Sequence, residues 1–250
     1  MYDAQMIAGI SPVPRDRRLL AVLLTLGLFA VGTLAFTPLE QALPPGITVP
    51  RFMLMIQPAV LVVAFVLLGW WAAPRVGFGA PVLSALLNKA DWQTPLRRAI
   101  GPAALIALLT AGILVIYGRA TAAAFSGAPD LPIAAITRLA YGGIGEELIA
   151  RWGVLTGLMV LALRLGAKTG SGFWLANFGA AALFAAGHFG LLFMLLPHPP
   201  MWLIAAVIAG NMVPALGFGW LYRQRGIEAA MLAHGGAHLA GLLAAGLGWV

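Results

Sequence analysis

The sequence predicts an all-α fold: a polytopic transmembrane bundle of about seven to eight membrane helices that forms one domain over residues 1–250. Three observations predict this fold. Hydrophobic residues make up 61% of the chain and charged residues only 9%, with a mean hydropathy of +0.94, whereas a soluble domain carries about 25% charged residues. About seven apolar stretches are each long enough to cross a bilayer, which takes about 20 helical residues. Basic residues gather in alternate connections between these stretches.

The apolar stretches are expected to be helices, because backbone polar groups in lipid must be satisfied within their own segment. The first follows the basic run Arg15–Arg18 and resembles a signal peptide, but it is near spanning length and no small-residue cleavage site follows, so we expect a retained span. Residues 80–98 mix apolar and basic positions and are expected to lie along the cytoplasmic interface. The predicted spans are 19–36, 52–73, 100–118, 131–163, 173–196, 201–222 and 227–249.

The fourth span is too long for a simple straight crossing. Gly142, Gly143 and Gly145 interrupt it just before its charged residues. We therefore expect a bent helix or two segments, and two segments would supply an eighth membrane element.

The basic residues predict how the helices are oriented, since cytoplasmic loops carry an excess of Lys and Arg. This bias predicts an N-terminus in the cytoplasm and a C-terminus outside. The richness in Ala, Leu and Gly, with Arg outnumbering Lys, favours a bacterial source and therefore a bacterial inner membrane. Because basic residues flank apolar runs, the net charge of +7 does not indicate a nucleic-acid partner. One set of loops holds Arg15, Arg17, Arg18, Arg75, Lys89, Arg97, Arg98, Arg164, Lys168, Arg223 and Arg225, and the other holds Arg51, Arg119 and Arg138.

Ionisable residues lie well inside three of the apolar stretches, where each costs about 3 kcal/mol or more at the bilayer centre. The remaining spans stay almost wholly apolar, so we expect these groups to meet in one polar pocket. No cysteine is present, which excludes disulfides and thiolate metal sites. The buried ionisable residues are Glu146, Glu147, Arg151, His188, His234 and His238.

Spacing within the fourth span separates the two glutamates. Glu147 and Arg151 are four residues apart and share a helix face, which favours a structural ion pair. Glu146 is turned about 100° away and is free to face elsewhere. In the other two spans, Phe184 shares a face with His188, and His234 shares a face with His238. The two glycines that follow His234 allow another backbone to approach closely.

Three motifs in chain order resemble the CPBP (Abi-type) family of CAAX proteases and bacteriocin-processing enzymes, which are intramembrane proteases. The resemblance covers about residues 131–245, the expected protease-like core, and the approach to the third motif, LGFGWLYRQRGIEAAMLAH, is also similar. The motifs are Glu146-Glu147-x-x-x-Arg151, Phe184-x-x-x-His188 and His234-x-x-x-His238.

The resemblance implies an endopeptidase that hydrolyses a peptide bond of a peptide or membrane-protein substrate with activated water. Glu146 matches the glutamate that activates this water together with His188, and His234 matches the histidine that stabilises the oxyanion. At position 238 the family usually has Asn or Asp, whereas this chain has His238, whose imidazole can also donate to an oxyanion.

The resemblance also gives the neighbouring motif residues supporting roles. Glu147 and Arg151 match the supporting half of the first motif, and Phe184 matches an aromatic packing residue. Taken alone, Glu147 with Arg151 is also well explained as a structural ion pair, and Phe184 as a core residue.

No cofactor is expected, because the family is understood as a metal-independent glutamate type. Zinc is the alternative: Glu146, His188, His234 and His238 are a plausible first shell by composition, although the zincin His-Glu-x-x-His motif is missing. Two other functions stay open. One is a non-enzymatic membrane partner, such as a bacteriocin-immunity or scaffold protein. The other is a proton-coupled transporter, which the lack of repeated halves disfavours.

Overall fold

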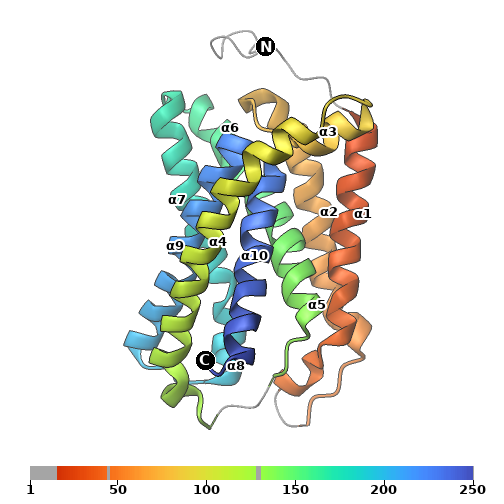
Figure 1. Ribbon diagram of the computed structural model, residues 1–250. Coiled ribbons are helices and arrows are strands. Elements are labelled where there is room, and N and C mark those ends of the chain that lie inside the picture. The colour runs from red at the N-terminus through yellow and green to blue at the C-terminus, as the bar shows by residue number, and fades with distance from the viewer. Residues whose placement is uncertain (1–15, 44–45, 128–130, 250) are drawn as a thin grey trace.

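The computed structural model describes residues 16–43, 46–127 and 131–249, and every element in these ranges is helical. Successive long helices run in opposite directions and pack side by side as a bundle (Figure 1). The predicted all-α bundle is therefore confirmed. The elements are α1 (Arg17–Gly32), η2 (Thr33–Phe36), η3 (Leu39–Ala42), α2 (Arg51–Val76), α3 (Pro81–Leu87), α4 (Gln93–Thr121), η4 (Ala122–Phe125), α5 (Ala135–Thr137), η5 (Arg138–Gly145), η6 (Leu148–Leu155), α6 (Thr156–Arg164), α7 (Thr169–Gly187), α8 (Phe189–Leu195), α9 (Met201–Arg225) and α10 (Ile227–Gly246).

Six helical stretches of the described residues are long and apolar enough to cross a membrane, and they correspond to all the predicted spans except the fourth. Their outward faces are apolar: on α4, four large side chains are 61–70% exposed (Leu105, Leu108, Leu109 and Ile116). A soluble monomer does not expose apolar patches of this extent. The chain is an integral membrane protein whose helix surfaces face lipid.

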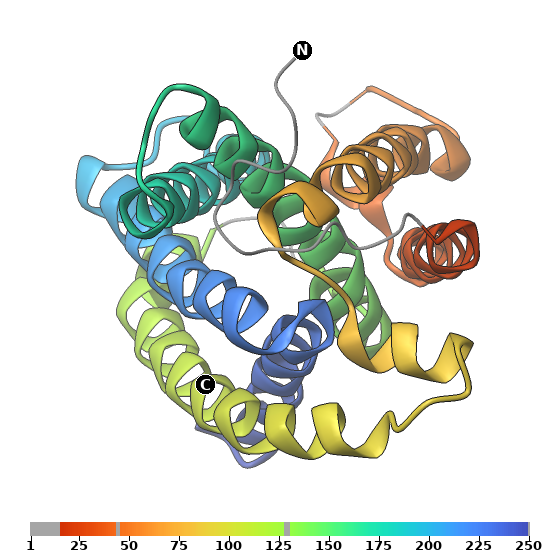
Figure 2. The same cartoon turned by 90° about the horizontal axis from the view of Figure 1, so that it is seen from above.

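The fourth predicted span is one unbroken helical run from Ala135 to Arg164, so the alternative of two separate segments is wrong. The run alternates between α-helix and π-helix, with η5 and η6 as the π-helical parts. In a π-helix each backbone N–H bonds five residues back, and such segments are frequent at functional sites. Seen from above, the run passes through the middle of the bundle (Figure 2).

Residues 80–98, which are expected to lie along the cytoplasmic interface, include α3 and the first turns of α4. Arg18 at the start of α1 donates to the Leu87 carbonyl (3.1 Å) and to Asn88 Oδ1 (2.8 Å), so α3 lies at the end of the bundle where α1 begins. Residues 93–98, the end of the stretch expected to lie along the interface, form the first turns of α4. The long stems of Arg97 and Arg98 explain how an early helical turn tolerates these charges, since such side chains extend toward water.

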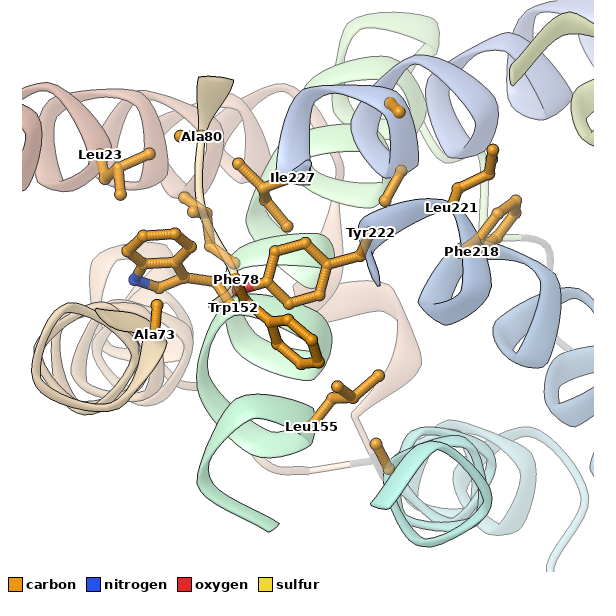
Figure 3. Packing of buried hydrophobic residues seen from close by; sticks show 14 of the residues in the cluster. Leu23, Ala73, Phe78, Ala80, Trp152, Leu155, Phe218, Leu221, Tyr222 and Ile227 are labelled. Atoms are coloured by element: carbon orange, nitrogen blue, oxygen red, sulfur yellow. The ribbon is translucent and has the colours of Figure 1, made fainter. Parts of the chain in front are cut away.

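The segment between α2 and α3 crosses this same end and enters the core. Gly77 ends α2 in the left-handed conformation (φ 71°). Phe78 then packs edge-on against Tyr222 (ring centroids 5.1 Å apart; Figure 3). Its ring also packs edge-on against Phe173 (6.4 Å). The Ile227 N–H donates to the Gly79 carbonyl (3.0 Å). These contacts fasten the start of α10 to the α2–α3 connection.

Glu228 is buried at this junction. The sequence places it at a span end, yet it is only 8% exposed, because residues 77–83 cover the first turn of α10. Its Oε1 accepts a hydrogen bond from the Leu83 N–H (2.8 Å), and its Oε2 has no hydrogen-bond partner within the described ranges. The carboxylate therefore joins α3 to α10.

Candidate active site

The predicted site residues come from three helical elements that meet inside the bundle. Glu146 lies between η5 and η6, and Glu147 and Arg151 follow on the same run. Phe184 lies near the end of α7, and His188 ends that helix. His234 and His238 lie in the middle of α10.

His234 lies between the two glutamates. Its Nδ1 is 2.7 Å from Glu147 Oε1, and its Nε2 is 3.8 Å from Glu146 Oε2. The first distance is a strong hydrogen bond to a charged acceptor. The second is longer than a direct hydrogen bond, and polar groups at such a separation are commonly bridged by water. The predicted approach of α10 to the first motif is therefore present.

Glu147 and Arg151 form the predicted ion pair, with Arg151 Nη1 2.8 Å from Glu147 Oε1. Both are buried, at 0% and 2% exposure, and Arg151 Nη2 donates to the Ala215 carbonyl of α9 (3.1 Å). The same Glu147 oxygen also accepts from His234, which joins the ion pair to α10. In contrast, the Glu146 side chain keeps 23% of its surface exposed and has no arginine or lysine partner among the described residues.

Stacked rings hold the imidazoles in place. Phe218 stacks on His234 (centroids 4.8 Å apart, planes 18° apart), and His238 also stacks on His234 (4.9 Å, 24°). Two rings cannot occupy one face, so His234 lies between them. The Arg151 guanidinium lies over Phe218 (5.3 Å) and Phe184 (4.9 Å), at distances typical of cation–π contacts. Phe218 is a site residue that the sequence did not single out.

Glycines let η5 and α10 approach each other at this level. A Cβ on Gly143 would lie 2.9 Å from the Gly235 Cα, and one on Gly142 would lie 2.5 Å from His238 Nε2. On the other side of α10, a Cβ on Gly236 would lie 3.1 Å from the Ala107 Cβ of α4. The expected close approach at the α10 glycines is therefore present, and the glycines of η5 take part in it.

His188 is joined to the cluster through an aromatic ring. Its Nδ1 is 2.9 Å from the Phe184 carbonyl, and its ring packs edge-on against Phe184 (4.9 Å). Phe184 in turn contacts His234 (6.0 Å). Within the described part of the chain His188 makes no direct ion pair with Glu146. The predicted partnership of Glu146 and His188 in water activation stays a prediction.

The four residues considered for zinc do not form a ligand cage. Among residues 16–43, 46–127 and 131–249, no three His, Asp or Glu side chains are arranged to hold a metal ion. The imidazole nitrogens of His234 already face the two glutamates, and its ring stacks against His238 instead of pointing with it at one centre. The metal-free expectation and the zinc alternative both stay predictions.

Comparison with known proteins identifies the same segment. A family model described as Type II CAAX prenyl endopeptidase Rce1-like matches residues 128–240, which hold all three motifs. No curated protein and no solved structure matched the chain. The family match confirms the resemblance indicated by the motifs: residues 128–240 are similar to the Rce1-like CAAX protease family.

Proposed function

We propose that this protein is an intramembrane endopeptidase that hydrolyses a peptide bond of a peptide or membrane-protein substrate with water activated by Glu146. The observation that carries the proposal is the unequal placement of the two glutamates around His234. Glu147 is buried and paired with Arg151, whereas Glu146 is partly exposed, has no arginine or lysine partner among the described residues, and lies 3.8 Å from His234 Nε2. One carboxylate is therefore committed to support, and the other is available for chemistry.

Glu146 is the proposed general base. A water molecule bridging Glu146 and His234 would lose its proton to the carboxylate as its oxygen attacks the substrate carbonyl carbon. General-base catalysis of this kind contributes about 100- to 10,000-fold. In this scheme the proton taken up by Glu146 is handed on through His188, whose ring packs against Phe184, to the leaving amine.

His234 and His238 are the proposed donors to the tetrahedral oxyanion. When His234 carries both protons, Nδ1–H is held by Glu147 and Nε2–H faces the reacting group. Two carboxylates and two cations then balance in the site (Glu146, Glu147, Arg151 and His234). Each good oxyanion donor is worth about 3 kcal/mol in other hydrolases. No step in this scheme requires a metal ion, and the protein is proposed to act without one.

The orientation in the membrane is also a proposal. Alternate helix directions bring the basic residues at the start of α1 and the ends of α2, α6 and α9 to one end of the bundle (Figure 1). The positive-inside rule then favours a cytoplasmic N-terminus and an external C-terminus, in a bacterial inner membrane.

The test is cleavage of quenched fluorescent peptides by purified protein in detergent. Glu146→Gln and His188→Gln are expected to lower kcat/KM by about 100-fold or more. Matched controls make the same chemical change outside the site: Glu40→Gln, whose carboxylate is exposed, and His198→Gln in an exposed turn. Unchanged cleavage by Glu146→Gln would exclude this mechanism.

A non-enzymatic role has one supporting feature, the histidine at position 238. In the structure the His238 ring is stacked on His234, and its Nε2 lies against Gly142. If Glu146→Gln protein restores the phenotype of a strain lacking the gene as well as wild-type does, the protein acts by binding and not by hydrolysis.

A further inference from the structure

Tyr141 lies one turn of the π-helix η5 before Glu146, and it belongs to none of the three motifs. Its carbonyl accepts a hydrogen bond from the Glu146 backbone N–H, which is the bond five residues back that defines a π-helix. In an α-helix of 3.6 residues per turn, two residues five apart would be turned about 140° from each other. The wider π-helical turn reduces this angle. The π-helix therefore brings Tyr141 toward the side of the run that carries Glu146.

The Tyr141 ring is held in place by packing around a glycine. A Cβ on Gly145 would lie 3.0 Å from Tyr141 Cδ2 and 3.4 Å from its Cε2, so the ring fills the space beside the residue that precedes Glu146. Ala30 of α1 lies 3.4 Å from the same Cβ position, and η5 contacts both α1 and α10, between which it passes (Figure 1). The half-buried ring also packs against the main apolar core. Its position is therefore fixed by contacts of its carbon atoms.

The Tyr141 hydroxyl has no hydrogen-bond partner in the described part of the chain. A buried tyrosine usually finds a partner for its O–H. Tyr222, the comparable residue of α9, has its hydroxyl 3.0 Å from the Thr156 hydroxyl. The group that acts electrostatically on the Tyr141 hydroxyl is the Glu146 carboxylate. A donor that protein atoms leave unused therefore lies within electrostatic reach of the proposed general base.

The Glu146 carboxylate also lacks a direct hydrogen bond to any described side chain. Its nearest charged neighbour is His234, whose Nε2 lies 3.8 Å from Glu146 Oε2, and 23% of the Glu146 side chain is exposed. A water molecule between the phenol and the carboxylate would satisfy both groups, as bound water does at other polar sites. Such a water accepts the phenol O–H on one lone pair and donates a hydrogen to the carboxylate. Its second lone pair is then free to attack.

We propose that Tyr141 is a positioning residue whose O–H holds the reacting water against Glu146. The water oxygen attacks the substrate carbonyl carbon, its proton moves to the Glu146 carboxylate, and the electron pair of the broken C=O π bond moves to the carbonyl oxygen. Tyr141 keeps its own proton throughout and only fixes the direction of the lone pair. The inference rests on the proposed endopeptidase function and adds a residue that the motifs do not contain.

The test is the kinetics and stability of Tyr141→Phe, which removes only the hydroxyl. The kcat for peptide cleavage is expected to fall about 10- to 100-fold with KM unchanged, as expected when a reacting group is misplaced. Stability is expected to stay unchanged, because the hydroxyl has no protein partner to lose. Replacing Tyr141 by 4-aminophenylalanine restores an N–H donor and should recover most of the lost kcat.

Tyr222→Phe is the matched control, because it removes a tyrosine hydroxyl that is bonded to Thr156. It is expected to lower stability and to leave kcat of the folded protein unchanged. Unchanged kcat in Tyr141→Phe would refute the positioning role alone and leave the endopeptidase proposal standing. A loss that 4-aminophenylalanine does not recover, or an equal loss in Tyr222→Phe, would also overturn it.

A spectroscopic measurement separates the two proposals. The chain has four tyrosines, so protein labelled with 3-fluorotyrosine gives few ¹⁹F resonances, and the loss of one in Tyr141→Phe identifies that of Tyr141. Glu146→Gln should move this resonance, whereas Glu40→Gln, which changes an exposed carboxylate, should not. Such a shift supports the placement of the phenol beside Glu146 even if wild-type protein cleaves nothing and the endopeptidase proposal fails. A Tyr141 resonance that Glu146→Gln leaves unmoved would overturn the inference.

Discussion

Removing the Arg151 charge tests whether the buried cluster is coupled as the structure indicates. Arg151 is 2% exposed and its Nη1 lies 2.8 Å from Glu147, itself 0% exposed. Arg151→Met keeps an unbranched side chain but removes the charge, so the buried carboxylate of Glu147 is left without its cation. Loss of one partner from a buried pair costs about 3–5 kcal/mol. We expect a loss of this size in the free energy of unfolding.

Removing both charges should recover most of that loss. Glu147→Gln keeps an amide oxygen that still accepts from His234 Nδ1, so the hydrogen bond to His234 survives. Alone, Glu147→Gln leaves the buried Arg151 charge without a partner. It is expected to lower the free energy of unfolding by about 3 kcal/mol or more. The double variant has no unpaired buried charge, because both replacements are neutral. Neutral replacements of a buried ion pair often leave the stability nearly unchanged. We expect it to be about 1–2 kcal/mol less stable than wild type.

The assay is reversible unfolding in mixed detergent micelles, followed by fluorescence of the chain's eight tryptophans. The matched control is the same pair of changes at the exposed ion pair Glu40–Arg51, where both partners are about 40% exposed and little coupling is expected. If the double variant loses the sum of the two single losses, to within about 0.5 kcal/mol, the two charges are independent. The account of the site as a balanced cluster would then be refuted.

Three further predictions concern other parts of the molecule, and a fourth concerns metal. Gly143→Ala should destabilise the protein by about 1–3 kcal/mol in the same assay, because its Cβ would meet the α10 backbone at 2.9 Å; Gly112→Ala, with nothing within 4 Å, should not, and equal effects would contradict the close approach. Glu228→Ala should cost about 1–3 kcal/mol by leaving the Leu83 N–H without an acceptor, whereas Glu228→Gln should retain near wild-type stability; the reverse order would exclude the bridging role. His238→Asn should cleave peptides within about tenfold of wild type while His238→Ala loses about 100-fold, and equal losses would exclude a donor role at this position. Incubation with a zinc chelator should leave cleavage unchanged, and a loss reversed by added Zn²⁺ would contradict the metal-independent mechanism.

The ionisable residues of the site could be predicted from the sequence, because a charged or imidazole side chain inside an apolar span has a high energetic cost and is therefore easy to recognise. It did not predict Phe218, since a phenylalanine in an apolar helix carries no such cost. Only the packing of α9 against α10 makes that ring the stacking partner of His234. The burial of Glu228 was missed for a related reason: at a span end a carboxylate normally reaches water, and here residues 77–83 fold over it.

The sequence by itself determined that the chain lies in a membrane, where its helices run and which side chains they carry into the apolar interior. These properties depend on composition and on spacing along one helix, as in the pairing of Glu147 with Arg151. Only the tertiary structure decided which helix faces meet: His234 lies between the two glutamates, and the ring of Phe184 contacts both His188 and His234. Spacing fixes the angle of a residue around its own helix axis. The rotation and depth of one helix against another depend on packing between distant segments, such as the contact of Gly143 with Gly235.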